Sequence, residues 1–148
     1  MGEKLKPAFL PTVNEKEAGS YSPLVLAFLG DSVYETAVRT MLINEGQKPV
    51  NVLNHVKTGY VKAHAQSEMM EAILQELTAE EAGIYRRGRN AKSATMAKNA
   101  SMADYRRATG FEALMGYLYL AGKQERMYEL MEKGILYYEE HFMHKPKK

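Results

Sequence analysis

Residues 24–35 read LVLAFLGDSVYE, an apolar run that has one acid, Asp31, set inside it and a second, Glu35, at its end. On a helix, with about 100° per residue, Leu24, Phe28 and Tyr34 all fall within about 60° of Asp31. The pattern therefore predicts a helix that carries Asp31 on its apolar, core-facing stripe. A carboxylate in that place costs several kcal/mol of desolvation unless a pairing cation, a hydrogen bond or a metal ion compensates it.

A second isolated acid lies in the C-terminal half of the chain. Glu112 is the only charged residue between Ala108 and Gly122, and a helix that is apolar on nearly every face is usually buried. Two such acids in one cleft would repel each other and need a shared cation, for which carboxylate oxygens select Mg²⁺ or Mn²⁺. Two simpler interpretations stay open. Glu112 could complete a capping box begun by Thr109, and Asp31 could pair with a buried Arg or cap a neighbouring helix.

Composition excludes several classes of protein. A chain of 148 residues is expected to form one domain, and without cysteine it has no disulfide framework and no thiolate metal site. No apolar run is long enough to span a membrane, and the N-terminus has no apolar core typical of a secretory signal. The motifs of zinc proteases, di-iron bundles, nucleotide-binding loops and serine hydrolases are absent. These features are expected of a cytoplasmic protein.

The helix signals predict an all-α fold. No alternating strand pattern occurs, whereas Ser22-Pro23 is a typical helix start and Thr78 opens a capping-box match. Asn51 is expected to cap a second helical stretch, within which Gly59 is expected to be a break or a point of close approach. The expected helices span 23–44, 52–77, 78–89, 101–108, 109–121 and 123–142. Residues 1–20 are expected to be an irregular lead-in, 21–143 the folded domain and 144–148 a flexible tail.

Positive charge is concentrated in one part of the chain. Residues 84–110 hold seven Arg and Lys residues and a single acid, Asp104, while the net charge of the whole chain is only +2. Such a block indicates one surface that faces a polyanion. A solvated helix face is the alternative.

The two isolated acids lie in motifs that resemble those of the ribonuclease III family. FLGDSV at 28–33 is similar to the core of the family signature, and FEALMG at 111–116 resembles its second motif. The segments RRGRNAK at 86–92 and TGFEAL at 109–114 resemble the short subgroup, mini-ribonuclease III. The resemblance implies a helical bundle like the ribonuclease III endonuclease domain. It also implies that no double-stranded-RNA-binding domain is appended within these 148 residues.

The resemblance implies an activity as well. The implied activity is that of a Mg²⁺-dependent endoribonuclease, with Mn²⁺ as a substitute. Such an enzyme hydrolyses double-stranded RNA as a homodimer and leaves 5′-phosphate and 3′-hydroxyl ends. Asp31 and Glu112 match the catalytic metal ligands of the family, and Phe28 matches an aromatic residue of its dimer interface. The subgroup is linked to maturation of 23S ribosomal RNA precursors, aided by a large-subunit ribosomal protein.

The chain departs from the family pattern at carboxylate positions. Ala27 and Leu24 stand where the standard signature has Glu, and Thr109 stands where the second motif has Asp. At Ala27 and Thr109, two of the four expected metal carboxylates are therefore missing. Because Mg²⁺ keeps several waters, two protein carboxylates can suffice, and water, phosphate oxygens or Glu35 could complete the shell.

Double-stranded RNA is recognised mostly by shape and through its phosphates and 2′-hydroxyls. The candidate RNA-binding residues are Arg86, Arg87, Arg89, Lys92 and Lys98 for phosphates, Asn90 and Ser93 for hydrogen bonds, and, as weaker candidates, Lys57, Thr58 and His64. Two rival functions stay open. The first is a non-catalytic RNA-binding or ribosome-assembly module that keeps the fold, and the second is a helical scaffold without an RNA role.

Overall fold

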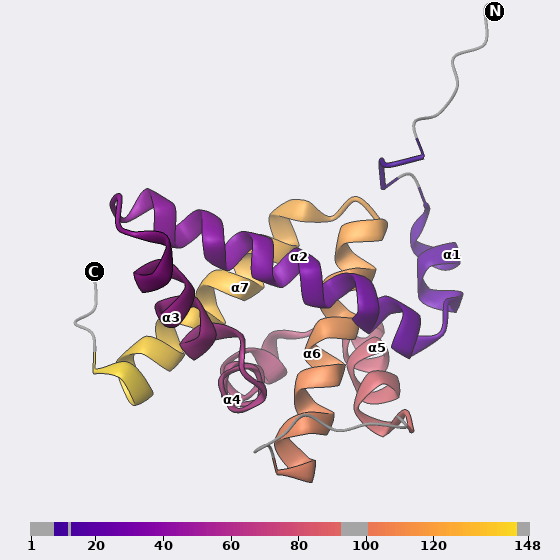
Figure 1. The fold of residues 1–148 in the computed structure, drawn as a ribbon. Helices are drawn as coiled ribbons and strands as arrows, with labels where there is room; N and C mark the ends of the chain where they lie inside the picture. Colours follow the sequence, from indigo (N-terminus) through magenta and orange to yellow (C-terminus); the bar gives the residue numbers. More distant parts are fainter. Residues whose placement is uncertain (1–7, 12, 93–100, 145–148) are drawn as a thin grey trace, which may run out of the picture.

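The fold is built around two long crossing helices, α2 (Pro23–Asn44) and α6 (Met102–Leu120) (Figure 1). A computed structural model of the chain describes residues 8–11, 13–92 and 101–144. Within these ranges the chain forms helices and no strand, which confirms the all-α prediction. The remaining elements are α1 (Glu15–Ser20), α3 (Val50–Val61), α4 (Ala63–Ile73), η1 (Leu74–Glu76), α5 (Ala79–Asn90), α7 (Gln124–Tyr138) and one π-helical segment, η2 (Glu139–Met143).

Several helix boundaries differ from those expected. Residues of the expected irregular lead-in form α1, and α3 begins at Val50, so Asn51 is not its cap. The break between α3 and α4 falls at Lys62, which is extended, and not at Gly59, which α3 tolerates in its interior. The two helices expected over 101–121 are one. Inside α6 the Thr109 hydroxyl donates to the backbone oxygen of Tyr105 and caps nothing.

The buried stripe of α2 is rotated away from Asp31. Its buried members are Leu26, Ala27, Gly30, Tyr34, Val38 and Leu42. Asp31 is exposed and borders this stripe, so the expectation that it faces the core is wrong. The reason is that Leu24 and Phe28 are apolar without being core residues. Their exposed fractions are 36% and 82%.

Two glycines bring the backbones of α2 and α6 into contact. A Cβ atom at Gly30 would lie 1.7 Å from the backbone oxygen of Glu112, and one at Gly116 would lie 2.0 Å from that of Leu26. Any side chain at these positions would therefore hold the helices apart. Because Asp31 follows Gly30 on one helix and Glu112 lies at the same crossing on the other, this contact places the two acids at one point.

The basic helix α5 is fixed by the predicted capping box. The Thr78 hydroxyl accepts from the Glu81 backbone N–H, and the Glu81 carboxylate accepts from that of Thr78. Glu81 also accepts two hydrogen bonds of 2.9 Å from Arg126 of α7. Burial alone would raise the pKa of Glu81. The Arg126 and Thr78 hydrogen bonds outweigh it and hold that pKa below its usual value.

Replacing Glu81 with Ala is expected to lower the free energy of unfolding at pH 7 by about 3 kcal/mol, because Arg126 loses its buried partner and α5 loses a cap. Since the folded-state pKa of Glu81 is lowered, its contribution is present above pH 4.5 and is lost as pH falls through the folded-state value. Urea unfolding of both proteins at several pH values measures this. A deficit that stays constant down to pH 2 would contradict the expectation.

No helix among the described residues combines the length and the apolar character needed to cross a membrane.

Candidate active site

Asp31 of α2 and Glu112 of α6 meet where the two helices cross. Glu112 is largely buried, and its pKa is raised to about 8, first by burial and then by the negative charge of Asp31 beside it. Glu112 does not belong to a Thr109 capping box, because Thr109 lies inside α6. Within the described ranges, Asp31 forms no salt bridge with Arg, Lys or His. Two acids that repel each other therefore share one site, and no cation from the described part of the chain compensates them.

The pair makes the stability of the metal-free protein depend on pH. A carboxyl whose pKa is raised on folding, from 4.5 to about 8 for Glu112, stabilises the fold fully below pH 4.5. That stability is lost as pH rises toward 8. We therefore expect wild-type protein in EDTA to lose free energy of unfolding between pH 5 and pH 8 relative to Glu112→Gln. Urea titrations test this, and parallel pH curves for the two proteins would contradict it.

Gln66 is a site residue that sequence reasoning missed. It lies on α4 with an exposed fraction of 2%, and its Nε2 atom donates to Glu112 Oε2 at 3.2 Å and to the Val61 backbone oxygen at 2.9 Å. Its Oε1 atom is buried and has no partner in the described part of the chain. The available signal was an amide on the buried face of α4, beside Ala65 and Met69.

The structure supplies no carboxylate at the positions where the family pattern has them. Ala27 and Thr109 are buried, and Leu24 is a partly exposed apolar residue. The carboxylate of Glu35 accepts a hydrogen bond of 2.9 Å from Arg39 Nε. The same carboxylate lies 3.6 Å from Lys57 Nζ. No group of three or more His, Cys, Asp or Glu residues suited to a metal occurs in residues 8–11, 13–92 and 101–144.

The remaining donor set still fits a hard divalent cation. Asp31 and Glu112 offer carboxylate oxygens, which Mg²⁺ and Mn²⁺ prefer, and their mutual repulsion is what a shared cation relieves. Two carboxylates suffice for an ion that keeps most of its waters.

The basic residues of α5 differ in whether their side chains already contact other groups of the protein. Arg86, Asn90 and Lys92 are exposed, but Arg87 donates to the Gly19 backbone oxygen at 2.6 Å and so ties α1 to α5. Arg89 lies over the ring of Tyr85, 5.6 Å from its centre, and its Nε donates to Asn90 Oδ1. Ser93 and Lys98 lie outside the described residues.

The weaker RNA-binding candidates on α3 and α4 have partners within the protein. Lys57 is largely buried and lies beside Glu35. Thr58 is exposed, but its hydroxyl donates to its own helix. The Nδ1 atom of His64 lies 3.3 Å from Asp104 Oδ2, and its ring packs edge-on against Phe142.

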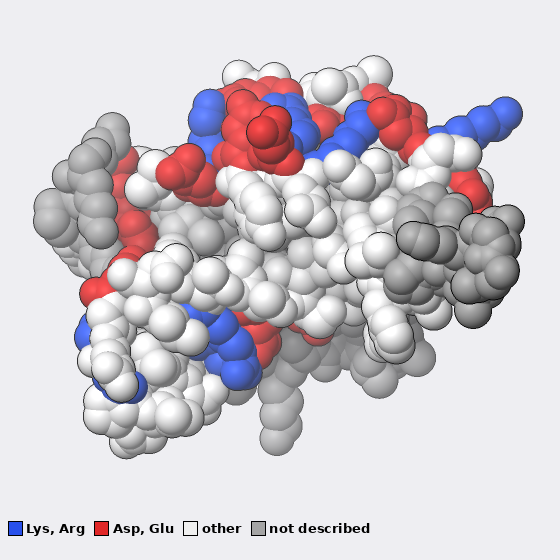
Figure 2. Space-filling view, turned by 90° about the horizontal axis from the view of Figure 1, so that it is seen from above, with Lys and Arg blue, Asp and Glu red and all other residues white. Residues whose placement is uncertain are grey.

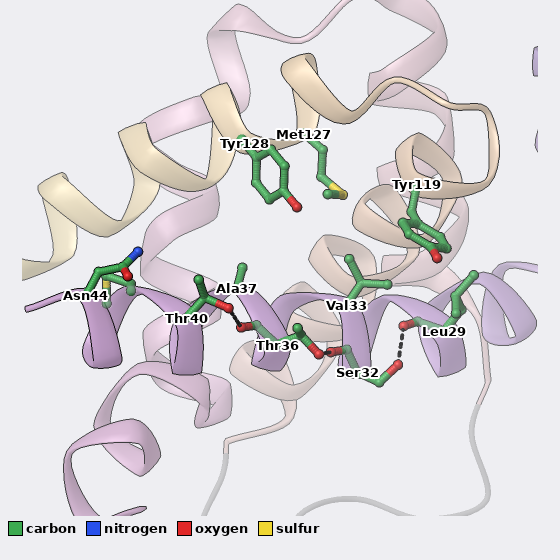
Figure 3. Close-up of a pocket in the computed structure, with 11 residues that line it drawn as sticks. Leu29, Ser32, Val33, Thr36, Ala37, Thr40, Asn44, Tyr119, Met127 and Tyr128 are labelled. Atoms are coloured by element: carbon green, nitrogen blue, oxygen red, sulfur yellow. Dashed lines mark hydrogen bonds between the residues drawn. The ribbon is translucent and has the colours of Figure 1, made fainter. Parts of the chain in front are cut away.

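Phe28 is an exposed apolar residue of α2, with an exposed fraction of 82%. The face seen from above is white over its centre, and charged side chains gather toward its edges (Figure 2). Beside α2 this face is hollowed, with Leu29 and Val33 on one side and Tyr119, Met127 and Tyr128 from α6 and α7 on the other (Figure 3). The hydroxyls along α2, such as that of Ser32, donate to the backbone of their own helix, so the wall of the hollow offers few free polar groups.

The family model for the ribonuclease III domain matches residues 24–123, which include both acids, all of α6 and α2 from its second residue onward. The chain belongs to the ribonuclease III family. Among curated relatives, Mini-ribonuclease 3 of Thermoanaerobacter sp. (strain X514) is 50% identical over 121 residues, 82% of this chain and 85% of the relative. Mini-ribonuclease 3 of Enterococcus faecalis is 52% identical over 110 residues, 73% of this chain and 83% of the relative. The predicted membership of the mini-ribonuclease III group is confirmed, and the family is one of endoribonucleases.

A solved structure has the same fold. The crystal structure of a Fusobacterium nucleatum protein matches 83% of this chain and 97% of its own, with a TM-score of 0.73 and 30% sequence identity. The predicted bundle of the ribonuclease III endonuclease type is therefore confirmed.

Proposed function

We propose that this endoribonuclease hydrolyses double-stranded RNA with a divalent cation, Mg²⁺ or Mn²⁺, held by Asp31 and Glu112. The observation that carries the proposal is the meeting of these two uncompensated acids at the α2–α6 crossing. A bound cation would supply an activated water and offset negative charge at the scissile phosphate. Products with 5′-phosphate and 3′-hydroxyl ends follow if water attacks the phosphorus and the 3′-oxygen leaves.

The residues have distinct roles in this proposal. Asp31 is exposed and faces the RNA, whereas Glu112 is largely buried and binds the cation from the protein interior. Exposed side chains of α5, above all Arg86 and Lys92, bind phosphates of the duplex. Arg87 contributes less to RNA binding because it holds α1, and Lys57 contributes little while it remains beside Glu35.

Replacing Arg86 with Ala is expected to weaken double-stranded RNA binding about equally for all sequences and to reduce the slope of log affinity against log salt by about 1. Lys133→Ala is the matched control, because Lys133 also carries one positive charge but forms an ion pair with Glu76 on another part of the surface. Fluorescence anisotropy with a labelled duplex at several salt concentrations measures both. An unchanged salt slope for Arg86→Ala would remove α5 from the interface.

The exposed apolar surface of α2 is proposed to bind a second copy of the chain. Phe28, 82% exposed, and Val25, 55% exposed, would be buried in that contact. Because each protomer carries one Asp31–Glu112 pair, a dimer has two sites and cuts one RNA strand with each, which yields staggered ends.

The proposed substrate is a double-stranded segment of the 23S ribosomal RNA precursor in the cytoplasm, presented with the help of a large-subunit ribosomal protein. Support comes from the similarity to the Mini-ribonuclease 3 relatives, which covers most of their length.

Cleavage of a long double-stranded RNA by purified protein, with Mg²⁺ and with EDTA, tests the activity. Metal-dependent products bearing 5′-phosphates support it. The missing carboxylates at Ala27 and Thr109 favour one alternative, a non-catalytic RNA-binding or ribosome-assembly module. Protein that binds the duplex but cuts it at no concentration of Mg²⁺ or Mn²⁺ would establish that alternative.

A further inference from the structure

The side-chain amide of Gln66 is held by two acceptors at once. Its Nε2 atom donates to Val61 of the α3 end and to Glu112 of α6, at 2.9 and 3.2 Å. The orientation of the amide is thereby determined, because turning it over would place Oε1 against two other oxygens. The α3–α4 corner is thus linked through one side chain to the buried acid of the site.

The Val61 contact has a simple structural explanation. Val61 is the last residue of α3, and the final carbonyls of a helix have no intrahelical donor. Gln66 satisfies this carbonyl across the extended residue Lys62, which separates the two helices. The contact fixes one end of the amide to the backbone, and the second N–H is then aimed at Glu112.

This arrangement leaves one buried hydrogen-bond acceptor of Gln66 unsatisfied. Gln66 Oε1 is buried and lacks a hydrogen-bond donor among the described residues. A buried polar atom without a partner costs about 1–3 kcal/mol. An apolar side chain would avoid that cost on a helix face whose neighbours include Ala65 and Met69. The stability of α4 therefore does not by itself account for an amide here.

Glu112 needs to be held in place. It lies beside Asp31, whose negative charge repels the ionised Glu112 carboxylate that a cation requires. The N–H of Gln66 fixes Oε2 in place beside Asp31. Hydrogen bonds of this kind to metal-binding carboxylates orient the ligand, and their loss typically costs about 10–100-fold in metal affinity or activity.

We propose that Gln66 is a positioning residue that preorganises Glu112 for a divalent cation. The inference rests on the proposed metal-dependent function. Gln66 binds neither the cation nor the RNA and acts only through Glu112.

Gln66→Met tests the inference, because Met has a similar length and neither donates nor accepts at that point. The dissociation constant for Mn²⁺, measured by calorimetry on folded protein without RNA, is expected to rise about 10–100-fold. The cleavage rate at saturating Mn²⁺ is expected to stay within a few-fold of wild type. Gln66→Asn, which keeps the amide but is one methylene too short to reach both acceptors, is expected to show the same weakening if the Met variant fails to fold.

Ser67→Ala is the matched control. Ser67 is equally buried on the same helix but contacts Arg107 and not Glu112, so its loss should leave the Mn²⁺ dissociation constant unchanged. Wild-type Mn²⁺ affinity in both folded Gln66 variants would overturn the inference and leave the proposed function intact. Wild-type protein that binds no Mn²⁺ and cuts no RNA would instead overturn the proposed function itself.

Discussion

Glu112→Gln is expected to reduce cleavage of double-stranded RNA by at least ~100-fold at any Mg²⁺ concentration, while RNA affinity stays within about twofold of wild type. The substitution keeps the volume of the side chain and removes one of the two carboxylates at the α2–α6 crossing. The proposed phosphate contacts come from α5, which the change does not touch. Gel assays of cleavage and anisotropy assays of binding on the same duplex measure the two effects separately.

The same variant provides its own control for folding. Because the substitution removes the repulsion between Asp31 and Glu112, the metal-free protein should be more stable than wild type above pH 8, not less. Loss of activity with a gain in stability is typical of a residue kept for function. Retained cleavage, or a loss of activity that tracks a loss of folded protein, would contradict the role given to Glu112.

Gly30→Ala is expected to lower the free energy of unfolding by at least ~3 kcal/mol, enough to leave much of the protein insoluble. A Cβ atom at Gly30 would lie 1.7 Å from the Glu112 backbone oxygen and 2.8 Å from the Gly116 backbone nitrogen. Backbone cannot move aside as a flexible side chain can, so α2 and α6 must separate. Any folded fraction would also hold Asp31 farther from Glu112 and bind Mn²⁺ more weakly.

Gly83→Ala is the control for this experiment. Gly83 lies inside α5, and a Cβ atom there would meet nothing within 4 Å. The added methyl group should stabilise the helix by up to about 1 kcal/mol. Urea unfolding of both variants measures the contrast. A Gly30→Ala protein as stable as wild type would mean that the two backbones are not in contact.

Local signals in the sequence predicted much of the fold. Thr78 marks the start of α5, because a capping box depends only on residues three positions apart. Ser22-Pro23 marks the start of α2 through Pro23 at the first helical position, while the Ser22 side chain forms no capping hydrogen bond. The continuity of α6 was missed at Thr109, whose hydroxyl can cap a helix or bond within one. Only packing against the rest of the fold decides between these outcomes.

The environment of the site was harder to predict. The sequence pattern places Asp31 on the core stripe because Leu24 and Phe28 are apolar, but both are exposed, and hydrophobicity alone does not distinguish a core from an exposed apolar face. The hydrogen bond between Gln66 and Glu112 joins residues 46 positions apart. The ion pair between Lys57 and Glu35 joins residues 22 positions apart. No spacing rule covers such pairs, so they become visible only in three dimensions.

Titration of metal-free protein with Mn²⁺ by calorimetry, comparing wild type with Glu112→Gln and Asp31→Asn, tests the central claim most directly. We expect wild type to bind Mn²⁺ at the α2–α6 crossing and to release protons in buffers below pH 8, because Glu112 must ionise to ligate. Both variants should lose that binding. Equal Mn²⁺ affinity in all three proteins would show that Asp31 and Glu112 do not form the metal site.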